Sequence, residues 1–135
     1  MNIGIMGFGH IGRYIYLLAQ KNPKYKIKCI SDLGNPEILH YLLKNESRIN
    51  SEYHIDGNYL ISENGKTRII NGIEPGDVPW DIFGVDWVIE ATGKYLNRDL
   101  LQKHIDSGAK RVVLTTLPES EIDNLIISGI NDNKL

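Results

Sequence analysis

The chain has little of several features that mark particular classes of protein. It contains one cysteine, Cys29, in 135 residues, so no internal disulfide can form and the ligand spacing of a zinc site is missing. Its net charge is −2 with both signs scattered, which provides neither a basic stripe for nucleic acid nor a polybasic run for a membrane surface. No apolar run approaches the roughly 20 residues that a membrane-spanning helix needs.

The composition is typical of an ordinary globular protein. Apolar residues make up 41% of the chain and charged residues 24%. A length of 135 residues allows one domain with a real core and is short for two. The first residues enter a strand pattern directly, without the basic start and apolar middle of a signal peptide. We therefore expect one domain over residues 1–135, located in the cytoplasm.

Apolar periodicity and turn residues predict strands and helices that alternate along the chain. Strands are predicted in 2–6, 26–31, 85–93, 111–116 and 124–130, helices in 10–21, 34–45 and 97–110, a hairpin in 59–70 around Asn64-Gly65, and a short helix or turn in 118–123. Asn35 and Asn97 are good helix N-caps. This order predicts an α/β fold with a doubly wound, mostly parallel sheet of the Rossmann type and a β-hairpin excursion.

A glycine motif stands between the first predicted strand and the first predicted helix. It runs Gly7-Phe8-Gly9-His10-Ile11-Gly12. In a βαβ unit, Gly7 would permit the tight turn, Gly9 would let a pyrophosphate approach the backbone, and Gly12 would let the helix pack on the strand. The alternative is a glycine-rich turn without a ligand.

Asp32 closes the second predicted strand, 20 residues beyond Gly12. That is the expected position of a carboxylate that accepts hydrogen bonds from the adenosine ribose. A carboxylate there repels a 2′-phosphate, so the motif favours NAD over NADP. The alternative is an Asp that caps a helix by chance.

Five segments of the chain resemble the phosphorylating, NAD-dependent glyceraldehyde-3-phosphate dehydrogenase family. They are "IGIMGFGHIGR", "ISDLGNPEILHYLLKNES", "VPWDIFGVDWVIEATGKY", "GAKRVVLTT" and "SGIND", in the family's order and over nearly the whole chain. The resemblance implies an NAD-binding domain, and it is far more specific than the glycine motif alone.

The resemblance also implies further cofactor contacts. It places Phe8, His10 and Ile11 along the pyrophosphate and nicotinamide ribose, Leu33 beside the adenine, Ala91, Thr92 and Gly93 beside the adenosine half, Tyr95 near the adenine, and Thr115 near the nicotinamide. The alternatives are a strand end for the "EATG" run and β-branched strand filler for Thr115.

The chain departs from the family's pattern at several of these positions. His10 replaces an arginine, and because histidine is only partly charged at neutral pH we expect NAD to bind somewhat more tightly as pH falls from about 7.5 to 6. Ile73 stands where the family often has an arginine beside the adenine, and "NESRIN" replaces the family's Y-D-S-x-H-G. These changes put the cofactor affinity in question.

The family's chemistry needs a cysteine thiolate in an S-C-T-T-N run, and these 135 residues do not contain that run. Cys29 lies in mid-strand and is interpreted as a structural residue. His40, His54 and His104 are interpreted as solvated or packing residues. No catalytic residue and no metal ligand is predicted, and we expect the chain alone to oxidise no aldehyde.

Three interpretations of the function follow. The first is the NAD-binding domain of a glyceraldehyde-3-phosphate dehydrogenase-like oxidoreductase, whose partner is a catalytic domain or chain that carries the nucleophile. The second is a stand-alone, inactive NAD-binding sensor or interaction module. A distant third is a Rossmann enzyme of another family, such as a semialdehyde or homoserine dehydrogenase. The surface that would meet a second domain could also drive assembly into a homo-oligomer.

Overall fold

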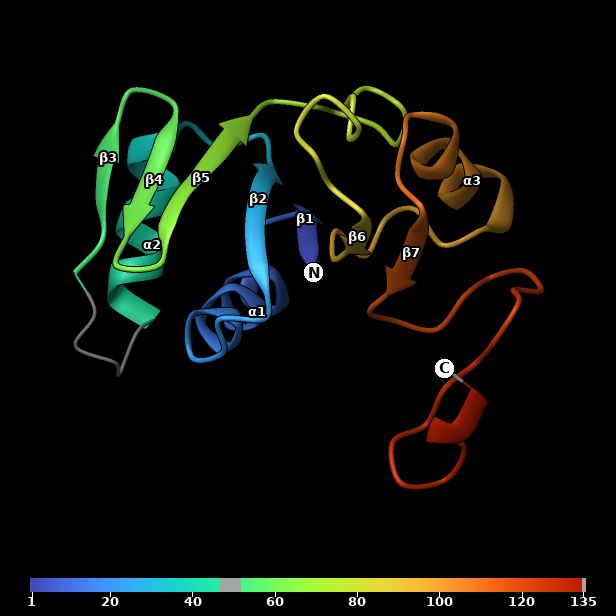
Figure 1. Cartoon of the computed structure of the whole chain (residues 1–135). Helices are drawn as coiled ribbons and strands as arrows, with labels where there is room; N and C mark the ends of the chain where they lie inside the picture. Colours follow the sequence, from blue (N-terminus) through green and yellow to red (C-terminus); the bar gives the residue numbers. More distant parts are fainter. Residues whose placement is uncertain (47–51, 135) are drawn as a thin grey trace.

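Seven strands form one sheet with the order β3-β4-β5-β2-β1-β6-β7, in a computed structural model that describes residues 1–46 and 52–134 (Figure 1). The strands are β1 (Asn2–Met6), β2 (Lys26–Ser31), β3 (His54–Asp56), β4 (Tyr59–Ser62), β5 (Gly65–Ile70), β6 (Trp87–Glu90) and β7 (Arg111–Leu114). The helices are α1 (His10–Gln20), α2 (Pro36–Glu46) and α3 (Arg98–Asp106), followed by a 3₁₀ turn, η1 (Asp132–Lys134). None of the helices in the described part of the chain is long and apolar enough to cross a membrane.

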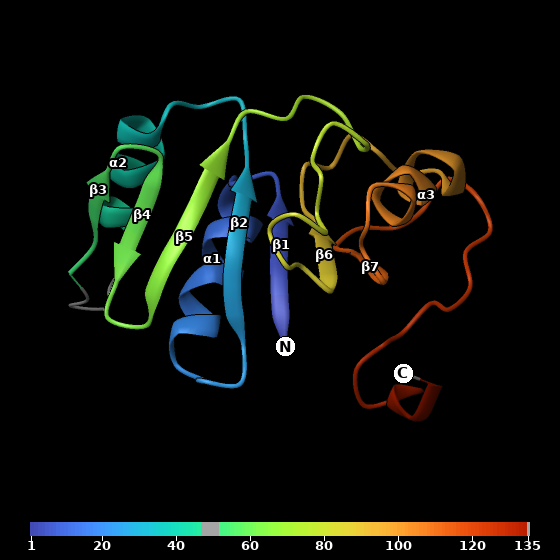
Figure 2. The ribbon, with the colours of Figure 1, turned by 45° about the horizontal axis from the view of Figure 1, so that its top comes forward.

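The sheet is wound in two directions from β1. Five neighbouring strands, β5, β2, β1, β6 and β7, are parallel, and β4 near one border runs antiparallel to both of its neighbours, β3 and β5. The chain adds β2 and β5 on one side of β1 and then returns to add β6 and β7 on the other side (Figure 2). The predicted doubly wound fold is confirmed, and the point where the winding reverses lies between β1 and β6, where ligands of such sheets bind.

Two apolar layers cover the two faces of the sheet. Alternation along β1 points Ile3 and Ile5 to one layer, which also contains Leu17 of α1 and Leu43 of α2. Met6 belongs to the other layer. In that layer the segment between β5 and β6 covers the sheet with three buried side chains, those of Val78, Trp80 and Val85. Although the segment between β5 and β6 has no helix or strand, it contributes to the hydrophobic core.

The predicted hairpin is confirmed, with a small shift of its turn. Ser62 pairs with Gly65, so Glu63 and Asn64 form the two-residue connection and Gly65 already belongs to β5. A second hairpin, between β3 and β4, was not predicted. Its first strand has three residues, too few for an alternating pattern to be recognised.

The predicted strand over 124–130 is wrong, and so is the helical alternative for 118–123. Residues 118–130 run as bends and turns that leave the sheet beyond β7, and Leu125 and Ile130 remain 52% and 77% exposed (Figure 1). Backbone amides that would bond to a neighbouring strand donate to side-chain oxygens here. Asn131 accepts from the Ile127 amide at 2.6 Å, and Asp132 accepts from the Gly129 amide at 2.9 Å.

The packing of α2 predicts very different costs for two neighbouring leucines. Leu43 is fully buried in the first apolar layer, whereas Leu42 is 37% exposed. We expect Leu43→Ala to lower the free energy of unfolding by about 2–5 kcal/mol, because it leaves a cavity. Leu42→Ala is the matched control and should cost less than about 1 kcal/mol. Urea denaturation followed by circular dichroism measures both, and equal losses would contradict this packing.

Candidate functional site

A cleft of about 320 Å³ lies at the carboxyl ends of the central strands, beside the point where the winding reverses. Its lining comes from the glycine turn, the ends of β1 and β2, and the segments that follow β5 and β6. The lining residues are Met6, Gly7, Gly9, Ser31, Asp32, Leu33, Gly72, Ile73, Ala91, Thr92, Lys94 and Tyr95. Segments far apart in the sequence therefore meet at the carboxyl ends of the strands, where doubly wound sheets bind their ligands.

Just over half of the predicted cofactor contacts line this cleft. Those that do are Gly7, Gly9, Asp32, Leu33, Ala91, Thr92 and Tyr95; those that do not are Phe8, His10, Ile11, Gly12, Gly93 and Thr115. The Phe8 side chain is buried in the first apolar layer, so only its backbone can face a ligand. Thr115 is the first residue after β7, and its hydroxyl donates to the Glu90 carbonyl at 3.1 Å.

The three glycines of the motif have three different surroundings. Gly7 has φ +91°, and a Cβ there would lie 2.8 Å from the Thr92 backbone nitrogen. A Cβ on Gly12 would overlap the Gly7 carbonyl oxygen, so the absence of a side chain lets α1 pack against the turn. A Cβ on Gly9 would meet no protein atom within 4 Å. The open space above Gly9 has room for a ligand group that approaches the backbone.

The N-terminus of α1 is left without a cap. Gly9 is the N-cap residue and offers no side-chain acceptor, and the first turn holds no acidic residue. By contrast, Asn35 and Asn97 accept from amides at the start of α2 and α3. The unpaired N–H groups and the positive end of the α1 dipole are thus available to an anion at the cleft.

Asp32 is held rigidly at the end of β2. Its Oδ2 accepts from the Phe8 amide at 2.7 Å and its Oδ1 accepts from the Gly34 amide at 2.8 Å. Each carboxylate oxygen can accept more than one hydrogen bond, so both can still receive ribose hydroxyls. The contact with Phe8 also fixes the carboxylate relative to the glycine turn.

Two hydrogen-bonded contacts tie the segment after β5 to the cleft walls. The Ser31 hydroxyl donates to the Gly72 carbonyl at 3.1 Å, and the Tyr95 hydroxyl donates to the Ile73 carbonyl at 2.6 Å. Burial raises the pKa of Tyr95 above its ordinary value, and the nearby Glu74 carboxylate adds to the shift. The hydroxyl therefore keeps the proton that makes this contact.

His10 contacts α2 instead of lining the cleft. Its imidazole Nδ1 meets a carboxylate oxygen of Glu46, while the Arg13 guanidinium donates to the other oxygen and to the Phe8 carbonyl at 2.9 Å. The hydrogen bond from Arg13 is the main cause that lowers the pKa of Glu46. An effect of His10 protonation on NAD binding would thus have to act through Glu46 and Arg13.

Sequence reasoning missed three polar or small residues of the cleft: Ser31, Gly72 and Lys94. Ser31 and Lys94 lie within segments that resemble the family, but nothing in those segments marks them as cleft residues. Ser31 ends β2, Gly72 follows β5 and Lys94 follows β6, so the three come together only in the folded sheet. Cys29 is fully buried, and burial raises the pKa of its thiol to about 12. It therefore stays a thiol at neutral pH, which fits a structural residue.

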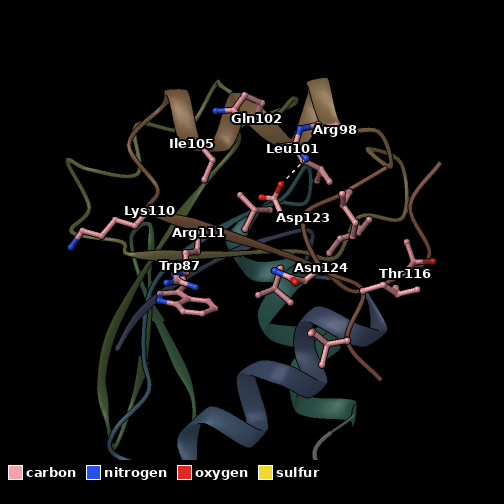
Figure 3. Close-up of a pocket in the computed structure, with 16 residues that line it drawn as sticks. Trp87, Arg98, Leu101, Gln102, Ile105, Lys110, Arg111, Thr116, Asp123 and Asn124 are labelled. Atoms are coloured by element: carbon pink, nitrogen blue, oxygen red, sulfur yellow. Dashed lines mark ion pairs between the residues drawn. The ribbon is translucent and has the colours of Figure 1, made fainter. Parts of the chain in front are cut away.

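A larger groove of about 500 Å³ lies elsewhere, between α3, β7 and residues 122–126 (Figure 3). Arg98 of α3 forms an ion pair with Asp123 across it at 2.8 Å. None of the predicted cofactor contacts lines this groove. The cleft at the glycine turn is thus the site that combines the motif with the geometry of the fold.

Comparison with known proteins decides the family. Residues 1–98 match the family model described as "Glyceraldehyde 3-phosphate dehydrogenase, NAD binding domain". The chain belongs to the glyceraldehyde-3-phosphate dehydrogenase family. It is 36% identical to the glyceraldehyde-3-phosphate dehydrogenase of Geobacillus stearothermophilus, 37% to that of Salmonella typhimurium and 35% to glyceraldehyde-3-phosphate dehydrogenase 1 of Bacillus subtilis.

These alignments cover 99% of the chain and 41% of each relative. The chain thus spans about two fifths of the length of the glyceraldehyde-3-phosphate dehydrogenases that it matches. It corresponds to their NAD-binding domain, and NAD is its cofactor. The uncapped α1 terminus, the space above Gly9 and the Asp32 carboxylate together suit the diphosphate and ribose of a dinucleotide.

The different surroundings of Gly9 and Gly12 predict that NAD binding and folding can be separated by substitution. Gly9→Ala places a methyl group in open space on the cleft side, so we expect little change in melting temperature and a loss of NAD affinity of about tenfold or more. Gly12→Ala should instead destabilise the fold by more than about 2 kcal/mol, because the methyl group overlaps the Gly7 carbonyl. Thermal melting and calorimetric titration with NAD distinguish the two; an unfolded Gly9→Ala would contradict the assignment.

The lowered pKa of Glu46 predicts a stability difference that depends on pH. Because the folded state holds this carboxylate ionised, its contribution is complete above the ordinary carboxyl pKa of about 4.3 and is lost as pH falls through the lowered value. Glu46→Gln should therefore be less stable than the wild type near pH 7, and the gap should close in acid. Urea denaturation across this range measures it, with exposed Glu121→Gln as control; a gap independent of pH would refute the pairing.

Proposed function

We propose that the cleft binds NAD with its diphosphate on the glycine turn and its adenosine ribose on Asp32. The observation that carries this proposal is the combination at one edge of an uncapped helix N-terminus, open space above Gly9 and a fixed carboxylate. The backbone amides of His10 and Ile11, in the first turn of α1, donate to the phosphate oxygens. Lys94, which lines the same cleft, supplies a positive charge toward them.

The remaining contacts follow from the cleft walls and the resemblance. Leu33 and Tyr95 flank the adenine, and Ala91 and Thr92 border the adenosine half. Gly93 and Thr115 are proposed from the family resemblance alone, since neither lines the cleft. Asp32 sets the preference for NAD, because a 2′-phosphate would face its negative charge.

For the whole protein we propose oxidation of an aldehyde coupled to phosphorylation, with NAD accepting the hydride, as part of glycolysis in the cytoplasm. The nucleophilic cysteine must then come from a catalytic domain or chain, because the one thiol in these 135 residues is buried. Assembly into a homo-oligomer belongs to the same proposal. The chain by itself binds the cofactor without oxidising an aldehyde.

Calorimetric titration with NAD and NADP tests the site. We expect the wild type to prefer NAD, and Asp32→Ala to lose about 10- to 100-fold in NAD affinity, since hydrogen bonds to a charged group contribute about 1.5–3 kcal/mol each. Asp56→Ala is the matched control, because Asp56 is an exposed carboxylate on β3 at the sheet border. Equal NAD affinity of the wild type and folded Asp32→Ala would overturn the proposal.

A further inference from the structure

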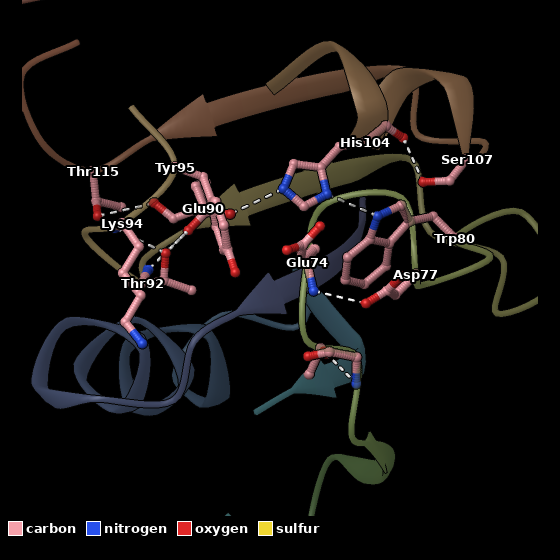
Figure 4. Close-up of polar contacts among 12 residues, drawn as sticks. Glu74, Asp77, Trp80, Glu90, Thr92, Lys94, Tyr95, His104, Ser107 and Thr115 are labelled. Carbon is pink, nitrogen blue, oxygen red and sulfur yellow. Dashed lines mark hydrogen bonds and ion pairs between the residues drawn. The ribbon is translucent and has the colours of Figure 1, made fainter. Parts of the chain in front are cut away.

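A chain of hydrogen bonds, buried at His104 and part-buried at Thr92, runs from Trp80 in the second apolar layer to Thr92 (Figure 4). The Trp80 indole nitrogen donates to His104 Nδ1 at 3.1 Å, and His104 Nε2 meets Glu90 Oε2 at 2.9 Å. The Glu90 Oε1 atom accepts from the Thr92 amide at 2.9 Å and from the Thr92 hydroxyl at 2.5 Å. The His104 and Glu90 side chains are both fully buried.

The donors and acceptors of this chain fix its protonation. An indole N–H can only donate, so His104 Nδ1 must be the acceptor and the imidazole proton must lie on Nε2. That proton points at Glu90, which also receives donors from Thr92 on its other oxygen. Both carboxylate oxygens therefore accept, and Glu90 is a buried anion beside a neutral imidazole.

Thr92 connects this chain to the cleft. It lines the cleft, and its backbone nitrogen lies where a side chain on Gly7 would have to go. Its hydroxyl is fixed by two hydrogen bonds, because it donates to Glu90 and accepts from the Lys94 amide at 3.1 Å. Glu90 therefore helps to fix the segment that follows β6 against the glycine turn, together with the hydrogen bond from the Ala91 amide to the Met6 carbonyl at 2.8 Å.

Packing alone does not account for these residues. A carboxylate and an imidazole lose their hydration when they are buried, and apolar side chains of similar volume fill a core at lower cost. Glu90 is the last residue of β6, next to the point where the winding reverses, and His104 reaches it from α3. The Glu90 hydrogen bonds connect the pair to Thr92, a residue that the proposed function places against NAD.

We propose that Glu90 and His104 are positioning residues for NAD, with Glu90 anchoring the Thr92 turn and His104, oriented by Trp80, holding Glu90 in place. The inference rests on the proposed function, because it requires the Thr92 segment to contact the cofactor. It adds to the binding site two buried residues that touch no ligand.

Two glutamine substitutions of similar volume test the proposal. In His104→Gln the amide can still donate to Glu90 and accept from Trp80, so the chain is preserved. In Glu90→Gln the charged acceptor is lost and the amide N–H groups face a donor, so the chain is broken. We expect NAD affinity about tenfold weaker for Glu90→Gln and a clearly smaller loss for His104→Gln, the conservative variant that retains both hydrogen bonds.

A spectroscopic signature separates positioning from general stability. The Thr92 amide proton, which donates to a carboxylate, should shift upfield in Glu90→Gln and stay in place in His104→Gln. Thr67→Val is the stability control. It removes a buried hydrogen bond of 2.8 Å to the Ile27 carbonyl, at the amino-terminal end of β2 and away from the cleft, and should leave NAD affinity unchanged.

A second pair of variants avoids the core if Glu90→Gln does not fold. Thr92→Val removes the hydroxyl link and Thr92→Ser keeps it, so the first should bind NAD more weakly than the second. The inference is overturned if folded Glu90→Gln binds NAD as the wild type does, if both glutamine variants weaken equally, or if Thr92→Val and Thr92→Ser bind alike. A wild type that binds no NAD would overturn the proposed function instead.

Discussion

The approach of α1 to the first turn is the constraint on which the cleft depends. Because Gly12 has no side chain, the helix rests directly on the Gly7 carbonyl, and its N-terminus comes to the end of β1. A wider separation would move the free amides of α1 away from the carboxyl edge of the sheet, where Asp32 is fixed. The positive end of the helix and the carboxylate thus keep a set distance before any ligand arrives.

Backbone groups carry much of this preorganisation. Asp32 accepts a hydrogen bond from the Phe8 amide, and the Ser31 and Tyr95 hydroxyls donate to the Gly72 and Ile73 carbonyls. Such contacts do not depend on which side chain the partner carries, so the cleft tolerates Ile73 where the family often has an arginine. The shape of the walls therefore depends on the Asp32, Ser31 and Tyr95 side chains and not on the side chain of Ile73.

The sequence predicted the parts of the fold that local patterns determine. Alternating strands and helices, the caps at Asn35 and Asn97, and the glycine turn all follow from short-range rules. The prediction of a strand over 124–130 was wrong because the Asn131 and Asp132 side chains accept hydrogen bonds from backbone amides of this segment. The apolar pattern of the segment gives no sign of these hydrogen bonds. The partner of His104 was equally hidden, because Glu90 lies 14 residues away on a strand and meets it only after the crossover folds.

The two borders of the sheet differ in how they are closed. One border ends in β3, a three-residue strand antiparallel to β4, and the other ends in β7, which is parallel to β6; neither has a further strand beside it in the described chain. Bare ladder edges attract pairing with other molecules, and short strands and cationic side chains oppose it. Here β7 has four residues, and the Arg111 guanidinium lies 5.2 Å above the Trp87 ring. Two features of this border therefore oppose intermolecular β-pairing: the short length of β7 and the positive charge of Arg111.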